Sequence, residues 1–172
     1  MKHYLFLFLF SGFLLLTNET HGYQKTDFGT KLKVDSVEIE IEIQFFNEST
    51  VRILKAPAGN IFDKKSLSVF ASPQKINFSV KQTGDKLLLK SKNVQVLVNL
   101  KDGKISFLNS NGKPLLTEKE NGAMFTSFND AGVNTYSVSQ SFVLDRDEAI
   151  YGLGQQQQGK MIQRNIKLHM IQ

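Results

Sequence analysis

The stretch Val37-Glu-Ile-Glu-Ile-Glu-Ile-Gln-Phe45 decides the fold class, because apolar and polar residues alternate at every position along it. Successive side chains of a β-strand point to opposite faces, so the pattern predicts a strand with one apolar and one polar face. We interpret Glu38, Glu40 and Glu42 as part of a solvated strand face. A carboxylate cluster for metal or acid–base chemistry is the alternative, and the strict alternation favours the solvated face.

The same two-residue period recurs in short runs along the rest of the chain, separated by Gly and Asn turn signals. No stretch after residue 22 has ten or more residues with helical apolar spacing. Many short strands joined by such turns are typical of an all-β sandwich or barrel. The strand candidates are 51–54, 76–80, 87–89, 94–98 and 105–108, with shorter ones at 115–116, 125–128 and 141–144. The turn candidates are 47–50, 56–60, 83–85, 102–103 and 109–112, and Asp102-Gly103 carries the signal of a tight hairpin with positive φ at both positions.

The N-terminus has the layout of a secretory signal peptide, which we assign to residues 1–22. A short basic start precedes an apolar run, Tyr4–Leu16, and a small polar stretch ends at Gly22, where we predict cleavage, with Thr20 at position −3. The alternative is a retained anchor, but the run of about 13 residues is short of the roughly 20 that a spanning helix needs. We therefore expect an exported protein, periplasmic or extracellular, with no membrane span after cleavage.

The composition disfavours several classes of function. The chain has no cysteine, so disulfides and thiolate metal sites are excluded, and this suits a bacterial periplasm. Its formal net charge of +5 is scattered rather than gathered into a basic stripe with aromatics, so we expect no nucleic-acid partner. The histidine that follows the signal-peptide border, His169, lies on an apparent strand at 166–171, and we predict neither a metal site nor a cofactor.

The stretch Glu148-Ala-Ile-Tyr-Gly-Leu-Gly-Gln155, followed by further glutamines, is the most distinctive motif of the chain. Gly152 and Gly154 allow positive φ or close backbone approach, and Tyr151 supplies apolar bulk, so we interpret these three as structural. Gln155 to Gln158 offer amide hydrogen-bond donors and acceptors. A plain structural bend at the edge of a sandwich is the competing interpretation.

This motif resembles the one that closes the N-terminal β-sandwich of glycoside hydrolase family 31, which contains α-glucosidases and α-xylosidases. The resemblance covers about residues 35–172 and includes Ile41–Ile53, Asp102–Phe107 and Phe142–Leu144. It implies an antiparallel, galactose-mutarotase-like β-sandwich spanning residues 23–172, incomplete at its C-terminus. It also implies that both catalytic aspartates belong to a downstream barrel, so we predict no catalytic residue in this chain and an inactive fragment.

The resemblance further implies two partners: an oligosaccharide or α-glycoside substrate, and the catalytic barrel of the same polypeptide. With such a substrate, Gln155, Gln158 and Asn165 are the candidate substrate-adjacent residues, because amide side chains suit sugar hydroxyls. Asp145, Asp147 and Glu148 form a tempting carboxylate cluster, which we interpret as a surface turn. A stand-alone carbohydrate-binding or adhesion module is the alternative function, but an ending inside the apolar stretch 166–172 favours a fragment. We expect marginal stability, with a melting temperature below about 60 °C.

Overall fold

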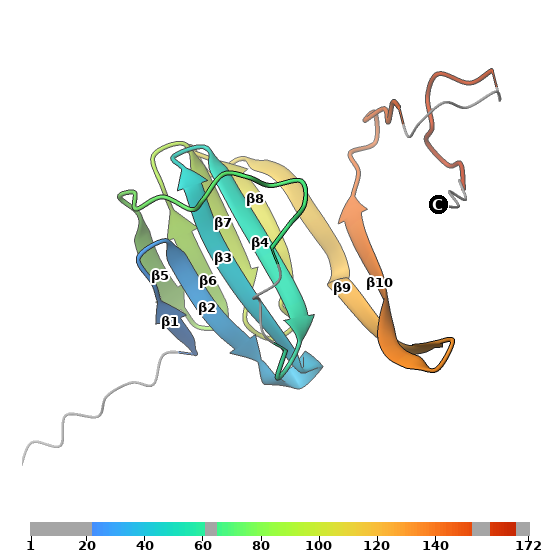
Figure 1. Ribbon diagram of the computed structural model, residues 1–172. Coiled ribbons are helices and arrows are strands. Elements are labelled where there is room, and N and C mark those ends of the chain that lie inside the picture. The colour runs from blue at the N-terminus through green and yellow to red at the C-terminus, as the bar shows by residue number, and fades with distance from the viewer. Residues whose placement is uncertain (1–21, 61–64, 153–158, 168–172) are drawn as a thin grey trace, which may run out of the picture.

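The computed structural model describes residues 22–60, 65–152 and 159–167, which form ten strands and one short 3₁₀ turn (Figure 1). Every strand pairing within its two sheets is antiparallel, which confirms the predicted all-β sandwich. Within these described residues, no helix is long and apolar enough to cross a membrane. The predicted signal peptide, apart from Gly22, lies outside the described residues.

The two sheets differ in size. The first has the order β1-β2-β3-β4, and the second has the order β10-β9-β8-β7-β6-β5. The first sheet consists of β1 (Tyr23–Lys25), β2 (Gly29–Val34), β3 (Ile39–Asn47) and β4 (Thr50–Pro57). The second consists of β5 (Ser79–Thr83), β6 (Lys86–Lys90), β7 (Val94–Asn99), β8 (Ile105–Asn109), β9 (Pro114–Asp130) and β10 (Val133–Val143).

The core lies between the sheets and uses the apolar face predicted for the opening stretch. Ile41, Ile43 and Phe45 of β3 are fully buried, and each such side chain contributes roughly 1.5–3 kcal/mol relative to an exposed position. Phe45 also stacks against Phe78 at a tilted angle, with 5.2 Å between ring centroids. The other buried members come from both sheets: Leu32, Val34, Ile39, Leu87, Leu89, Val94, Val96, Val98 and Ile105.

Glu38 is exposed as predicted, but the prediction for this stretch is wrong about where the strand begins and about Glu42. The strand begins at Ile39, because Val37 ends a 3₁₀ turn (Asp35–Val37) and Glu38 adopts a left-handed φ of 50°. Glu42 is buried, since Lys31 lies opposite it on β2 with Nζ 3.5 Å from its Oε1. Gln44 Nε2 also donates to that oxygen at 2.9 Å, so two neighbours on the sheet cover the carboxylate.

The predicted turns at 47–50, 83–85 and 109–112 are confirmed, but the tight hairpin at Asp102-Gly103 is wrong. Residues 100–104 form a wider loop in which Gly103 has a φ of 70° and Asp102 does not have a positive φ. The side chains of Asn99 and Asp102 accept hydrogen bonds from the Lys101 and Lys104 amides, which holds the loop open. A Cβ on Gly103 would lie 2.6 Å from Ile39 Cδ1, so this loop packs closely against the core.

The later strands are longer than predicted. The candidates at 115–116 and 125–128 belong to one strand, β9, and the candidate at 141–144 is the end of β10. The two strands are joined by Ala131 and Gly132, whose φ values of 48° and 91° match a two-residue hairpin turn. Conversely, Ile76 and Phe78 pack on the core without belonging to a strand, and so do not form the predicted strand at 76–80, since β5 begins at Ser79. The described part of the predicted strand at 166–171, residues 166–167, lies outside any strand.

Candidate functional site

The β9–β10 hairpin leaves the sandwich at a large bulge. Phe142 pairs with Glu118 and Gln140 pairs with Ala123, so residues 119–122 of β9 oppose the single residue Ser141. Bulges bend the strand that carries them. Beyond this point the hairpin projects past β4 and away from the body of the molecule (Figure 1).

Glu118 lies at this bulge with a side chain only 4% exposed. Its Oε2 accepts hydrogen bonds from Lys55 Nζ at 2.6 Å and from the Ile105 amide at 2.8 Å. Its Oε1 accepts a hydrogen bond from Gln140 Nε2 at 2.6 Å. One carboxylate therefore connects β4, β8 and β10, and its charge is both paired and hydrogen-bonded, as burial requires.

Lys55 reaches this carboxylate from the other sheet. It occupies an inward position of β4, opposite the fully buried Ile41, and its side chain is 6% exposed. Its Nζ also donates to the Gly103 carbonyl at 2.9 Å. Gly122 also belongs to this cluster and has a φ of 47°. A Cβ at this position would lie 2.3 Å from Glu118 Oε2, so any larger residue would clash with the carboxylate.

Sequence reasoning did not identify Glu118, Lys55 or Gln140. One signal was available for Lys55, which continues the two-residue period of Val51 and Ile53 and so takes a position that points into the core. A charged residue at such a position requires a buried partner of opposite sign. The sequence offers no comparable signal for which carboxylate that partner is.

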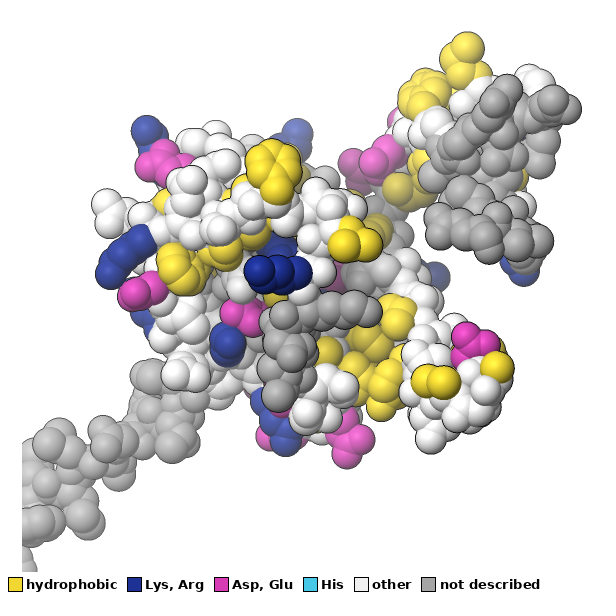
Figure 2. Space-filling view, viewed as in Figure 1, with side chains coloured by type: hydrophobic (Ala, Val, Ile, Leu, Met, Phe, Trp, Pro, Cys, Tyr) yellow, Lys and Arg dark blue, Asp and Glu magenta, His cyan; other side chains and the backbone are white. Residues whose placement is uncertain are grey.

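Two hollows lie between the hairpin and the rest of the sandwich. One, of about 230 Å³, adjoins the ion pair and is lined by Ile53, Lys55, Phe107, Glu118, Ala123, Phe125, Val138, Gln140 and Phe142. The other, of about 470 Å³, is lined by Val37, Glu38, Ile39, Pro57, Ala123, Met124, Phe125, Ser127 and Tyr136. Figure 2 shows apolar side chains gathered where the hairpin faces the body.

The candidate substrate-adjacent residues lie beyond β10. Gln155 and Gln158 fall outside the described residues, as does Gly154, so their predicted roles stay predictions. Asn165 is exposed and has a left-handed φ of 62°. Of the predicted structural residues, Tyr151 is exposed and Gly152 has a φ of 87°, a conformation that favours glycine.

The chain around the motif is tied together by Arg164 and Gln163. Arg164 Nη1 donates to the carbonyls of Asp145 at 2.8 Å and Glu148 at 2.7 Å. Gln163 is buried; its backbone N–H donates to the Ile150 carbonyl at 2.8 Å, and its Oε1 has no hydrogen-bond partner among the described residues. The carboxylates at 145–148 are exposed and lie in and beside a turn, which confirms their interpretation as a surface turn.

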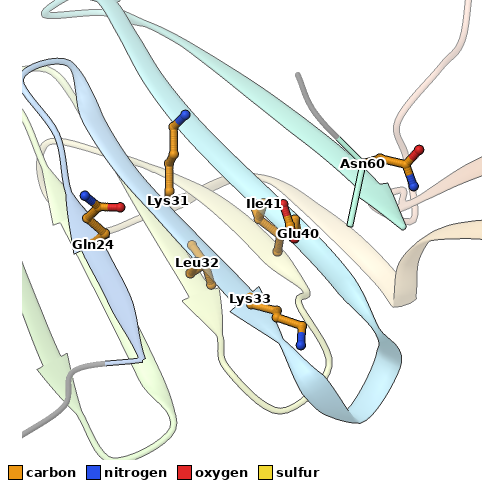
Figure 3. A pocket seen from close by; sticks show the side chains of 7 residues that line it. All are labelled: Gln24, Lys31, Leu32, Lys33, Glu40, Ile41 and Asn60. Carbon is orange, nitrogen blue, oxygen red and sulfur yellow. The ribbon is translucent and has the colours of Figure 1, made fainter. Parts of the chain in front are cut away.

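A third candidate is an open groove of about 380 Å³ on the first sheet (Figure 3). Its lining comes from β1, β2, β3 and the chain after β4: Gln24, Lys31, Leu32, Lys33, Glu40, Ile41 and Asn60. A hydrogen bond to Asp35 raises the pKa of Lys33 above its ordinary value, with their charge attraction as the second cause. Glu40 Oε1 accepts a hydrogen bond from the Gly59 amide at 3.1 Å. The groove has amide groups at its ends, and no aromatic ring lines it among residues 22–60, 65–152 and 159–167.

No group of three or more His, Cys, Asp or Glu side chains that could hold a metal ion occurs among residues 22–60, 65–152 and 159–167. His169, the histidine considered above, lies outside the described residues. The buried carboxylate of Glu118 accepts hydrogen bonds from three donors, one of them the charged Lys55 ammonium, which is the arrangement of a structural ion pair.

A family model described as the glycosyl hydrolase 31 N-terminal galactose mutarotase-like domain matches residues 40–171. An α-xylosidase from Saccharolobus solfataricus is 27% identical over 118 residues, which are 68% of this chain and 16% of that protein. The crystal structure of a family 31 α-xylosidase from Xanthomonas citri superposes with a TM-score of 0.72 at 32% identity, covering 81% of this chain and 15% of that one.

A family 31 α-xylosidase from a soil metagenome, solved with xylose, shares the fold, with a TM-score of 0.66 at 21% identity over 84% of this chain and 24% of that one. The chain thus spans less than a quarter of the length of each of these three relatives. The family model covers well over half of the chain, including β4 to β10 of the structure. This chain therefore belongs to glycoside hydrolase family 31, as an N-terminal galactose mutarotase-like domain.

Proposed function

We propose that this chain is the N-terminal domain of an exported α-glycosidase that hydrolyses α-xylosides or α-glucosides. The observation that carries the proposal is the match of residues 40–171 to the N-terminal domain of a glycosidase family. The relatives named α-xylosidase support the substrate class, including one that is 32% identical over most of this chain. Since this chain corresponds to 15% of that relative, the catalytic barrel would lie in further sequence.

On this proposal the domain shapes and supports the sugar site, and the barrel performs the chemistry. A retaining glycosidase needs a nucleophilic carboxylate and an acid/base carboxyl roughly 5–5.5 Å apart. Glu118 does not suit either role, because Lys55, Gln140 and the Ile105 amide occupy its oxygens. Gln155, Gln158 and Asn165 would contribute amide hydrogen bonds to the substrate.

The proposed export rests on the layout of residues 1–22. Mass spectrometry of the protein recovered from its native host tests it directly. A mature N-terminus at Tyr23 supports the proposal, and a protein that retains Met1 contradicts it.

The enzymatic proposal is tested by assaying two polypeptides with p-nitrophenyl α-xyloside and α-glucoside. Residues 23–172 alone should show no turnover, whereas the polypeptide read onward from residue 172 should hydrolyse at least one substrate. In the longer polypeptide, Gln155→Ala should raise KM more than the matched change Gln82→Ala on the distant strand β5. An inactive longer polypeptide, or turnover by residues 23–172, would contradict the proposal.

A stand-alone carbohydrate-binding module is the second candidate. The open groove of Figure 3, with Gln24 and Asn60 at its ends, is the observation in its favour. The lack of an aromatic ring among the described residues of its lining weakens it, because aromatic rings supply much of the apolar contact at binding surfaces. Calorimetric titration of residues 23–172 with xylo- and gluco-oligosaccharides distinguishes the two: binding heat that disappears in Asn60→Ala supports the module, and no heat eliminates it.

A further inference from the structure

The second sheet extends further than the first on the side of the hairpin. Lys55 of β4 contacts Glu118 of β9 and the loop before β8, so β4 lies over this part of the second sheet. Among the described residues β4 pairs with β3 alone, and so it is an edge strand of the first sheet. The second sheet continues past this edge through the rest of β9 and through β10, and two hollows rather than packed side chains lie between this part and the first sheet.

The inner face of the hairpin is apolar and open. Phe125 and Tyr136 meet edge to face with 6.3 Å between ring centroids, and Val138 lies beside them opposite Phe125. Val138 is 61% exposed, although an equivalent inward residue of β3 is fully buried. The two hollows of about 230 and 470 Å³ both lie between this face and the first sheet. Together they form a slot bounded by β4 on one side and the β9–β10 hairpin on the other.

The smaller of the two hollows, at the inner end of the slot, is suited to apolar side chains rather than to a sugar. Its polar groups at the inner end, Lys55, Glu118 and Gln140, are bonded to one another and offer sugar hydroxyls little. The remaining lining of the smaller hollow is aliphatic and aromatic. An edge strand presents a row of free backbone N–H and C=O groups, which an extended segment satisfies by adding to the sheet.

We propose that an extended strand from the continuation of this polypeptide adds to the free edge of β4 and fills the slot under the β9–β10 hairpin. This inference rests on the proposed function, because it needs sequence beyond Gln172. Alternate side chains of the added strand would point inward onto Phe125 and Val138, and the others would face solvent. The added strand extends the first sheet over the part of the second sheet that now lies open.

The same polypeptide is a better occupant than a second copy for two reasons. The relatives continue far beyond the matched segment, which is 15% of the Xanthomonas citri enzyme. The chain that leaves β10 also runs on the hairpin's side of the molecule (Figure 1). Sequence that follows it is thus tethered near the slot at an effective concentration on the order of millimolar, which a second molecule rarely reaches.

Thiol reactivity tests the proposal cleanly, because the chain has no cysteine of its own. Val138→Cys places one thiol in the slot, and Ser137→Cys places a matched thiol on the neighbouring residue, which lines neither hollow. Both are introduced into residues 23–172 and into the polypeptide read onward from residue 172. The rate of reaction with iodoacetamide is measured for each, and turnover of p-nitrophenyl α-xyloside and α-glucoside is measured on the longer form.

In residues 23–172 both thiols should react at similar rates. In the longer polypeptide the thiol at 138 should react about 100-fold more slowly, while the thiol at 137 keeps its rate. If the thiols at 137 and 138 react at equal rates in a longer polypeptide that is active, the proposed added strand is contradicted and the proposed function is not. A protected thiol in an inactive polypeptide would overturn the proposed function alone. If the thiol at 138 in residues 23–172 becomes more protected as the protein concentration rises, the occupant of the slot is a second copy. A reading frame that stops at Gln172 would contradict the proposal, because no following sequence would exist to supply the added strand.

Discussion

The β3 strand and the β10 strand are built from the same kind of sequence but reach opposite degrees of burial. Both are antiparallel, and both alternate larger apolar residues with smaller or polar ones over part of their length. Yet Ile41 is fully buried, whereas every residue of β10 is exposed. The difference lies in the opposite layer, since β3 faces the second sheet and β10 faces a hollow. Strand pairing organises the backbone, and a facing sheet is what buries the side chains.

The largest effect that sharpens this comparison comes from removing one phenylalanine ring from each region. Phe45→Ala should lower the free energy of unfolding by about 3–5 kcal/mol, because the ring is fully buried in the core. Phe128→Ala should lower it by less than about 1 kcal/mol, because that ring is 53% exposed on β9. Urea denaturation followed by circular dichroism measures both; equal losses would break the distinction between the regions.

The next effect concerns the ion pair at the junction. Lys55→Met should destabilise the protein by about 3 kcal/mol or more, because it leaves the buried Glu118 carboxylate without its counter-ion. The double variant Lys55→Met/Glu118→Gln should recover much of that loss, since the amide is neutral and its oxygen can still accept the Ile105 hydrogen bond.

Lys101→Met is the matched control for the ion pair. It removes an exposed lysine 2.9 Å from Asp85, a contact that raises the lysine's pKa but lies in solvent. Denaturation should reveal almost no change for this variant. A double variant no more stable than Lys55→Met would show that the charge imbalance is not the cause of the loss.

A smaller effect is expected at the glycine that lies against the ion pair. Gly122→Ala should cost about 1–3 kcal/mol, because its Cβ would lie 2.3 Å from Glu118 Oε2 at a φ of 47°. Gly112→Ala is the control: its φ of 81° carries the same kind of backbone strain, but nothing lies within 4 Å of the new Cβ. The excess loss for Gly122 measures the clash, and identical losses would mean that Glu118 moves aside freely.

The smallest effect is expected at the hairpin tip and has the opposite sign. Ala131 has a left-handed φ of 48°, which costs a non-glycine residue about 1–2 kcal/mol. Ala131→Gly removes that strain, and the extra freedom of glycine in the unfolded chain offsets part of the gain. Amide exchange of the β10 residues nearest the turn should slow by a few-fold; faster exchange would show that the turn is not strained by alanine.

The sequence predicts the core of this domain well, and it predicts poorly the ion pair where the hairpin leaves the sandwich. The difference arises because the core follows from local sequence patterns and the ion pair does not. The apolar face of β3 follows from alternation within one strand, so Ile39, Ile41, Ile43 and Phe45 could all be assigned. Predicting the Lys55–Glu118 pair would require knowing which strands of the two sheets lie over one another. No local sequence pattern contains that information. The sequence predicts only short strands within the long hairpin, because polar residues such as Glu118 and Gln140 interrupt the apolar alternation along β9 and β10.

Native-state hydrogen exchange on residues 23–172 tests most directly whether the core strands of the sandwich are fully packed while the β9–β10 hairpin is not. We predict that the slowest amides of β3, β6 and β7 exchange only through global unfolding, whereas those of β10 exchange through local opening, at least about 100-fold faster. Equal protection in β10 and β3 would contradict the comparison, because it would mean that the exposed hairpin is as firmly held as the buried core.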